Sequence, residues 1–171
     1  GRHHIAIEFA LFLAVFFIAG FAMVGFGLRS GVRANQAKYW PTVNGTIASC
    51  RVAESTASDS GTSYQVEVRY LYAVSGRNYE GTRIAFGYSG SSGRGAHQEI
   101  AARLNSAESV LVHYNPRNPA TAVLAYGWNR SIILLLVFGI TWLLFTTGFS
   151  LLVFMTTRPD TGILNTLVTI P

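Results

Sequence analysis

The sequence predicts a membrane protein in which two transmembrane helices flank a small, mainly antiparallel β-barrel or sandwich domain with one short helix. Residues 131–155 contain no charged side chain, and residues 5–28 contain only one, Glu8. Each stretch is long enough to cross a hydrocarbon core, which requires about 20 apolar residues. Between these stretches, apolar and polar residues alternate in short runs separated by turn-forming residues, a pattern typical of strands.

The composition is consistent with two membrane spans. Hydrophobic residues make up 50% of the chain and charged residues only 12%, whereas soluble domains contain about 25% charged residues. Within residues 29–130, eleven Arg or Lys side chains stand against six Asp or Glu. Such an excess suits anionic lipid headgroups, nucleic acid or an acidic partner, and we expect it mainly to flank the membrane.

The first transmembrane helix is expected over residues 5–28. We expect it to continue beyond the membrane to about residue 37, before Pro41, whose ring cannot continue a helix interior. The stretch is longer than the apolar region of a signal peptide and lacks an A-x-A cleavage site before charged residues, which favours an uncleaved anchor. Glu8 is expected at the interface, although an acid inside a span can also mark an ion path.

Small side chains recur along this first helix. Ala6, Ala10 and Ala14 are four residues apart, which places them on one helical face, and such faces let helix backbones approach closely in lipid. We therefore expect the face to pack against the second span or against another subunit. The residues expected to mediate helix packing are Ala6, Ala10, Ala14, Gly20, Gly25 and Gly139.

Basic and aromatic residues flank the spans, as is usual at membrane–water interfaces. The residues expected at the interface are Arg29, Arg33, Lys38, Trp40, Trp128, Arg130 and Arg158. The second transmembrane helix is expected over residues 131–155. A C-terminal tail over residues 156–171 carries apolar side chains that suit the membrane surface or a partner.

The β-rich domain is expected over residues 40–128. Residues 42–53 are rich in β-branched side chains, and residues 54–61 are a polar loop of turn formers. Residues 64–74 alternate, with tyrosine and valine on one face and mostly polar side chains on the other, which predicts a half-buried strand. A turn then leads to residues 79–86 as the expected antiparallel hairpin partner.

Residues 87–95 form a glycine- and serine-rich loop before a short helix expected over residues 96–104. A glycine-rich loop ahead of a helix can bind phosphate, but this loop lacks the G-x-x-x-x-G-K-[ST] arrangement, so we expect a mobile connector. Further strands are expected over residues 110–114 and 121–124. The rigid turn between these strands is expected to consist of Asn115, Pro116, Asn118 and Pro119.

Four motifs follow one another in this domain. They are Trp-Pro-Thr-Val-x-Gly-Thr-Ile at residues 40–47, Tyr-x-Val-x-Val-x-Tyr-x-Tyr at 64–72, Gly-x-x-Tyr at 76–79, and a closing strand at 110–124 that contains Tyr-Asn-Pro-x-Asn-Pro. With a hydrophobic helix on either side, they resemble the bacterial membrane proteins grouped as domain of unknown function 3592. The resemblance covers nearly the whole chain and implies a small β domain between two membrane helices, with no catalytic residue. We expect the protein in the bacterial inner membrane.

Chemistry-bearing residues are few. His97, His113 and Asp59 show no metal-ligand spacing, and the sequence contains no G-x-S-x-G elbow or paired-carboxylate motif. We therefore expect neither an enzyme nor a metal or cofactor site. The single cysteine, Cys50, excludes an intrachain disulfide and is expected to be buried and inert.

Basic residues interleaved with aromatics would suit nucleic acid, and Arg69, Tyr70, Tyr72 and Arg77 offer such a pattern. Strand alternation places the two tyrosines opposite Arg69, where they are expected to fill the core. No nucleic-acid partner is therefore expected.

Two functions remain open. The first is an accessory or structural subunit that docks on a larger membrane protein complex, or a homo-oligomer, through its helices and β domain. The second is a stand-alone, membrane-tethered binding module, such as a toxin-neutralising immunity protein or an envelope-stress sensor. Basic residues near the span ends are more numerous on the domain side than on the terminal side, which favours a cytoplasmic over a periplasmic domain.

Overall fold

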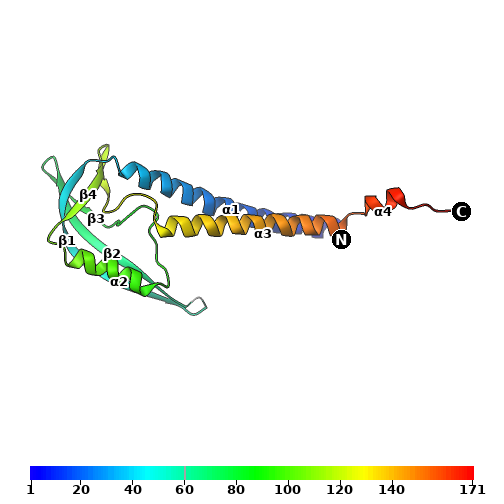
Figure 1. Ribbon diagram of the computed structural model, residues 1–171, viewed down its shortest axis with the longest axis horizontal. Coiled ribbons are helices and arrows are strands. Elements are labelled where there is room, and N and C mark those ends of the chain that lie inside the picture. The colour runs from blue at the N-terminus through cyan, green and yellow to red at the C-terminus, as the bar shows by residue number, and fades with distance from the viewer. Residues whose placement is uncertain (60) are drawn as a thin grey trace. The chain divides into compact units, whose positions relative to one another are not determined.

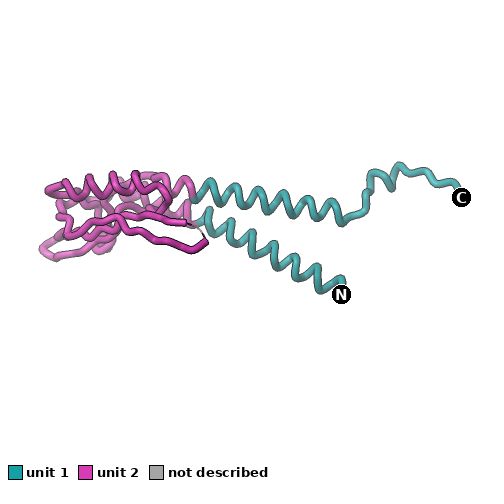
Figure 2. The backbone as a smooth tube through the Cα atoms, turned by 90° about the horizontal axis from the view of Figure 1, so that it is seen from below, with its two compact units in different colours: residues 1–25, 135–171 teal, residues 26–134 magenta. Residues whose placement is uncertain are grey.

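The computed structural model describes residues 1–59 and 61–171. Residues 1–25 and 135–171 form one compact unit, and residues 26–134 form a second (Figure 2). The elements, labelled in Figure 1, are α1 (Arg2–Ala37), β1 (Thr42–Ala57), β2 (Gly61–Val74), β3 (Arg77–Gly81), α2 (Arg94–Asn105), β4 (Val110–Asn115), β5 (Asn118–Val123), α3 (Arg130–Thr157) and α4 (Thr161–Thr166).

The two long helices, α1 and α3, are long and apolar enough to cross a membrane. In their most apolar windows only 6% of the α1 residues and 17% of the residues over Arg130–Thr166 are buried inside the chain. The core helix of a soluble domain would bury most of such a surface, because apolar side chains gain free energy on leaving water. These two helices instead leave most of their apolar surface exposed.

Within the first unit, α1 and α3 pack through aromatic and small residues. The indole of Trp142 stacks on Phe16, with ring centroids 5.0 Å apart, and its Nε1–H donates to the Phe16 carbonyl at 2.8 Å. Gly20 lies against the side chains of Leu143 and Trp142, where an added Cβ would come within 2.5 Å of Leu143. The absence of a side chain at this position permits the close helix contact.

The second unit contains a five-stranded antiparallel sheet in the order β3-β2-β1-β4-β5 (Figure 1). In the described part of the chain this sheet is open, so the expected barrel or sandwich is not confirmed. The edge strands β3 and β5 do not pair with each other as strands. Instead, the backbone N–H groups of Leu124 and Ala125, just after β5, donate to the Ile84 carbonyl, beyond β3, at 2.9 and 2.8 Å.

Strand lengths depart from the sequence-based expectation at two places. The polar residues expected as a loop over 54–61 largely continue the β1–β2 hairpin, with pairs from Glu54↔Tyr64 to Ala57↔Gly61. Serine and threonine tolerate a solvated two-stranded ribbon, and backbone pairing outweighs their turn preference. In contrast, β3 ends at Gly81, well before residue 86, and the following chain leaves the sheet.

The alternation expected for residues 64–74 is confirmed. Val66, Val68, Tyr70 and Tyr72 are buried, while the residues between them are exposed. The buried face of β2 packs against α2, and the alternating pattern therefore determines which face of the sheet forms the core.

The centre of this core is Tyr70, whose side chain is fully buried. Its hydroxyl donates to the carbonyl oxygens of Arg83 at 2.8 Å and Ala122 at 3.1 Å. Tyr70 thus links the segment after β3 to β5, which is the closure that strand pairing does not provide. Gly81 lies directly against the Tyr70 ring, where a Cβ would overlap it.

The helix α2 covers part of the same face, with His97 and Ala101 buried. Cys50 of β1 is half-buried, and its Sγ lies 4.0 Å from the Ala101 carbonyl. Burial raises the pKa of the Cys50 thiol, which keeps it protonated and unreactive at neutral pH.

Candidate functional site

A cluster of basic and aromatic side chains surrounds Phe86 in the second unit. The guanidinium carbons of Arg33, from α1, and Arg83, from the segment after β3, lie 4.5 and 4.8 Å from the centroid of the Phe86 ring. Trp40 meets the same ring edge-on at 5.7 Å. Phe86 itself is only 4% exposed, so cation–π contacts hold both guanidiniums against a fixed ring. We call Arg33, Arg83 and Phe86, with Arg29 nearby on α1, the arginine cluster.

The backbone of Phe86 is fixed by the start of α3. Asn129 donates from Nδ2 to the Phe86 carbonyl at 2.8 Å, and its Oδ1 accepts from the Ile132 N–H at 3.2 Å as an N-cap. The next residue, Gly87, has φ +77, and a Cβ there would come within 2.5 Å of Ile132. A glycine is therefore required at this position for two independent reasons.

Among the residues that the structure describes, no carboxylate forms an ion pair with the arginine cluster. Burial lowers the pKa of Arg33, and repulsion from Arg83 and Arg29 lowers it further. The ion pairs among the described residues lie elsewhere, at His4–Glu8, Arg51–Glu67 and Arg69–Glu80. The positive charge of the cluster is therefore available for an external anion.

The other residues expected at a membrane interface lie in both units. Trp128 packs on Gly31 of α1, where a Cβ would come within 2.7 Å of the indole. Lys38 lies over the ring of Tyr39 at 5.8 Å, and Arg158, in the first unit, lies over Phe154 at 4.6 Å. Arg130 is the first residue of α3.

The expected helix-packing residues divide into two groups. Gly20 and Gly139 lie at the contact between α1 and α3, with Gly139 close to Met23 and Val24. Nothing lies within 4 Å of the Cβ position of Gly25. The three alanines of the small-residue face, Ala6, Ala10 and Ala14, are exposed.

The expected turn is a hairpin between β4 and β5. Asn115 pairs with Asn118, and the Asn115 Oδ1 accepts from the Arg117 N–H at 3.0 Å. The Pro119 carbonyl accepts a hydrogen bond from the Tyr72 hydroxyl. This last contact fastens the hairpin to the core face of β2.

The loop over residues 87–95 is held by hydrogen bonds that the sequence does not reveal. His97 is 4% exposed; its Nδ1 lies 2.6 Å from the Tyr88 hydroxyl and its Nε2 lies 2.7 Å from Ser91 Oγ. The Tyr88 oxygen also accepts from the Val66 N–H at 2.9 Å. One His97 tautomer that satisfies these contacts takes the Tyr88 proton at Nδ1 and donates its Nε2–H to Ser91.

This chain of hydrogen bonds resembles a nucleophile–base pair, but its polarity differs. In that tautomer Ser91 Oγ accepts from Nε2, and it also accepts from the Gly93 N–H at 3.3 Å, so His97 does not act as a base toward the Ser91 proton. A serine in that state is a poor nucleophile. The arrangement suits a structural role, in which these hydrogen bonds hold the loop against β2.

His113 is also buried, at 7% exposure, and its ring meets Tyr126 edge-on at 5.1 Å. Burial lowers its pKa, so the imidazole is neutral at pH 7. Its Nδ1 has no hydrogen-bond partner among the described residues. No group of three His, Cys, Asp or Glu side chains in the described ranges is placed to hold a metal.

The outer edge of β2 is unpaired over a short stretch. β3 pairs with β2 from Tyr70 onward, and Ser91 exchanges backbone hydrogen bonds with Tyr64 at 2.7 and 3.0 Å. Backbone groups alternate between the two edges of a strand, so Val66 and Val68 direct theirs to this edge, where the Val66 N–H already donates to the Tyr88 hydroxyl. An open groove of ≈ 410 Å³ lies here, with Thr82 in its lining.

The comparisons place the sheet within a family. Residues 43–129 match the family described as "Domain of unknown function (DUF3592)". The match runs from the second residue of β1 to the N-cap of α3 and includes Arg83 and Phe86. Comparison with curated proteins and with solved structures gives no match. Because the matched segment makes up just over half of the sequence, the chain belongs to the family of domain of unknown function 3592.

Proposed function

We propose that this chain is a non-catalytic, two-pass protein of the bacterial inner membrane, an accessory or structural subunit that docks on a larger membrane protein complex. The observation that carries the proposal is the outward-facing apolar surface of α1 and α3, which the chain itself leaves almost entirely uncovered. Lipid covers such a surface at no cost in free energy, whereas water does not.

The exposed alanines of α1 supply a site for a partner helix. Ala6, Ala10 and Ala14 lie on one face and do not contribute to the α1–α3 contact, which uses Gly20 and Gly139. Close approach of a second helix at a small-residue face gains van der Waals contacts that lipid tails provide less well. This face therefore supports docking within the membrane.

The β domain supplies a second docking element. The edge of β2 at the Val66 carbonyl and at Val68, which no strand of the described chain covers, can accept an extended segment of a partner as an added strand. The ion pairs Arg51–Glu67 and Arg69–Glu80 flank this edge on the exposed face of the sheet. Their charges discourage non-specific edge pairing and leave a specific partner as the favoured occupant.

Co-purification tests the proposal. We expect the full chain, extracted with its surrounding lipid, to elute with larger membrane subunits in fixed stoichiometry. The double substitution Ala10→Phe/Ala14→Phe should abolish that association, because the bulky rings block close helix approach. The matched control is Leu144→Phe, at a position 69% exposed on α3. Elution as a free chain before any substitution would contradict docking on a complex.

The alternative is a stand-alone, membrane-tethered binding module, such as a toxin-neutralising immunity protein or an envelope-stress sensor. It is supported by the same unpaired edge of β2 and its groove, which a single ligand protein can occupy. In the co-purification experiment it corresponds to a monomer or dimer that gains one partner.

We propose that the β domain faces the cytoplasm. The arginine cluster adds Arg83 to the basic residues on the domain side, and cytoplasmic flanks carry an excess of Lys and Arg. A cysteine placed at the exposed Ser55, in a chain with Cys50→Ser, reports the side. We expect a membrane-impermeant maleimide to label it only after the inner membrane is permeabilised; labelling with the inner membrane intact would reverse the assignment.

A further inference from the structure

The arginine cluster has the composition of a phosphate site. Each guanidinium carries five N–H donors in a planar fork that matches phosphate oxygens. In the described chain, neither Arg33 nor Arg83 donates a side-chain hydrogen bond or forms an ion pair. Two complete sets of donors are therefore free beside the same buried ring.

The two guanidiniums are also held in place. Phe86 contacts both, and it is itself buried and fastened through its carbonyl to Asn129. Bringing like charges to one ring costs free energy unless an anion neutralises them. Groups held near one another before a ligand arrives lose less conformational entropy on binding it.

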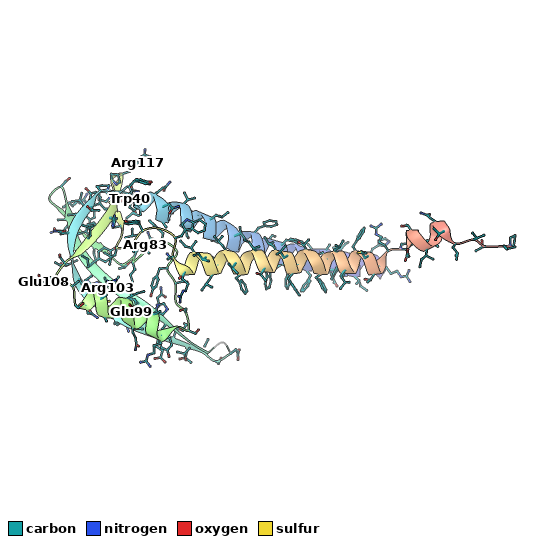
Figure 3. The ribbon with its side chains drawn as sticks, in the orientation of Figure 1. Trp40, Arg83, Glu99, Arg103, Glu108 and Arg117 are labelled. Atoms are coloured by element: carbon teal, nitrogen blue, oxygen red, sulfur yellow. The ribbon has the colours of Figure 1, made fainter. Side chains whose placement is uncertain are left out.

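Four acidic residues of this unit are paired elsewhere or lie apart from the cluster. Glu67 and Glu80 are paired with other arginines. Figure 3 shows Glu99 and Glu108 beside or beyond α2, apart from Arg83 and Trp40. No carboxylate among the described residues competes with an incoming phosphate by forming an ion pair with the cluster.

The position along α1 indicates the source of the phosphate. Arg29 and Arg33 follow the apolar stretch 5–28 by one and five residues, which is about 1.5 and 7.5 Å along a helix. The headgroup layer on each side of a bilayer is roughly 5–8 Å thick. If α1 spans the membrane, both arginines lie at headgroup depth.

We propose that Arg33 and Arg83, assisted by Arg29, bind the phosphate group of an anionic phospholipid on the domain side of the membrane. This inference rests on the proposed membrane insertion of α1 and α3. The bound headgroup neutralises the cluster and holds α1 and the segment after β3 to the same lipid. The β domain thereby gains a lipid-dependent anchor in addition to its two helices.

Native mass spectrometry of the full chain in detergent micelles, titrated with phosphatidylglycerol or phosphatidylcholine, tests the site. We expect preferential retention of phosphatidylglycerol. The variant Arg33→Gln/Arg83→Gln should weaken this retention roughly tenfold or more, because it removes two charge-assisted contacts. The matched control, Arg77→Gln/Arg103→Gln, loses the same charge at exposed positions outside the cluster and should retain the wild-type preference.

A second variant distinguishes a defined phosphate site from general electrostatic attraction of the anionic lipid to positive charge. Arg33→Lys/Arg83→Lys keeps the charge but loses the planar fork, and we expect it to bind more weakly than the wild-type chain. Equal retention of both lipids by the wild-type chain would overturn the proposal, as would an equal loss in the matched control. Unchanged binding in the lysine variant would reduce the site to a diffuse charge effect and also overturn it.

Two further experiments identify where the bound phosphate comes from and, if the test fails, which of the two proposals is wrong. Inorganic phosphate, added to the chain already loaded with phosphatidylglycerol, should not displace the lipid at equal concentration; displacement would assign the site to a soluble phosphate. Carbonate extraction of cell membranes tests insertion separately. A chain released by carbonate would refute the proposed membrane function, whereas a retained chain without lipid preference would refute only the arginine site.

Discussion

Replacing Tyr70 with alanine is expected to destabilise the β domain by about 3–5 kcal/mol, the usual cost of truncating a buried aromatic side chain. Tyr70 is fully buried and stands beside Tyr72, with ring centroids 5.9 Å apart. Its loss leaves a cavity and removes the hydroxyl that links Arg83 to Ala122. Pulse proteolysis of the full chain in urea would measure the change as a lower midpoint for cleavage within β2.

The conservative substitution Tyr70→Phe isolates the hydroxyl. It retains the ring but leaves two buried carbonyl groups without their donor, which should cost about 1–3 kcal/mol. The matched control is Tyr79→Phe, because Tyr79 stacks on Tyr72 but its hydroxyl makes no hydrogen bond among the described residues. An equal loss in both variants would show that the Tyr70 hydroxyl does not close the sheet.

The pH dependence supplies an independent check on Tyr70. Burial raises its pKa well above the ordinary value of 10.0. Above that pH the unfolded chain releases the proton while the folded chain retains it, so the folded state binds more protons and its stability falls as pH rises. The slope of the urea midpoint against pH above pH 10 should be smaller in Tyr70→Phe than in the wild-type chain.

Replacing Gly20 with leucine is expected to separate α1 from α3 in the first unit. An added Cβ already comes within 2.5 Å of Leu143, and a whole side chain would also displace the Trp142 indole from Phe16. Overpacking of this kind costs about 1–3 kcal/mol. Cysteines at Phe9 and Phe149, whose rings are 6.3 Å apart, would report the contact through the yield of a short bis-maleimide cross-link, in a chain with Cys50→Ser.

The matched control is Gly25→Leu on the same helix. Nothing lies within 4 Å of the Cβ position of Gly25, so this variant gains the same helix propensity without a clash. We expect the cross-link yield to fall in Gly20→Leu and to stay at the wild-type level in Gly25→Leu. Equal yields in the two variants would show that the Gly20 contact does not hold the helices together.

Local patterns predicted much of the fold. The alternation of residues 64–74 depends only on the two-residue period of a strand, and it correctly identified Val66 and Tyr70 as core. The two apolar stretches predicted helices because length and composition alone determine whether a segment can cross a bilayer. A turn between β4 and β5 was predictable because proline restricts the backbone locally, but it occupies only residues 116–117, whereas Asn115 ends β4 and Asn118 and Pro119 begin β5.

The closure of the sheet was not predictable in the same way. A barrel or sandwich was expected because the apolar faces of the strands must be shielded from water. The structure does bury the apolar face of the sheet. It does so with α2, the segment after β3 and the Tyr70 hydroxyl rather than with paired edge strands. Hydrogen bonds to backbone outside regular strands produce no periodic pattern in the sequence, so the sequence could not predict them.

The sequence by itself determined the order of the elements, the two apolar helices, the core face of β2 and the family, because each depends on neighbouring residues. The tertiary structure alone brought Arg83 to Arg33 across Phe86, assigned Gly20 rather than Gly25 to a helix contact, and joined His97 to Tyr88 and Ser91. These contacts depend on how distant segments meet. Packing in three dimensions, rather than any local preference of the chain, decides them.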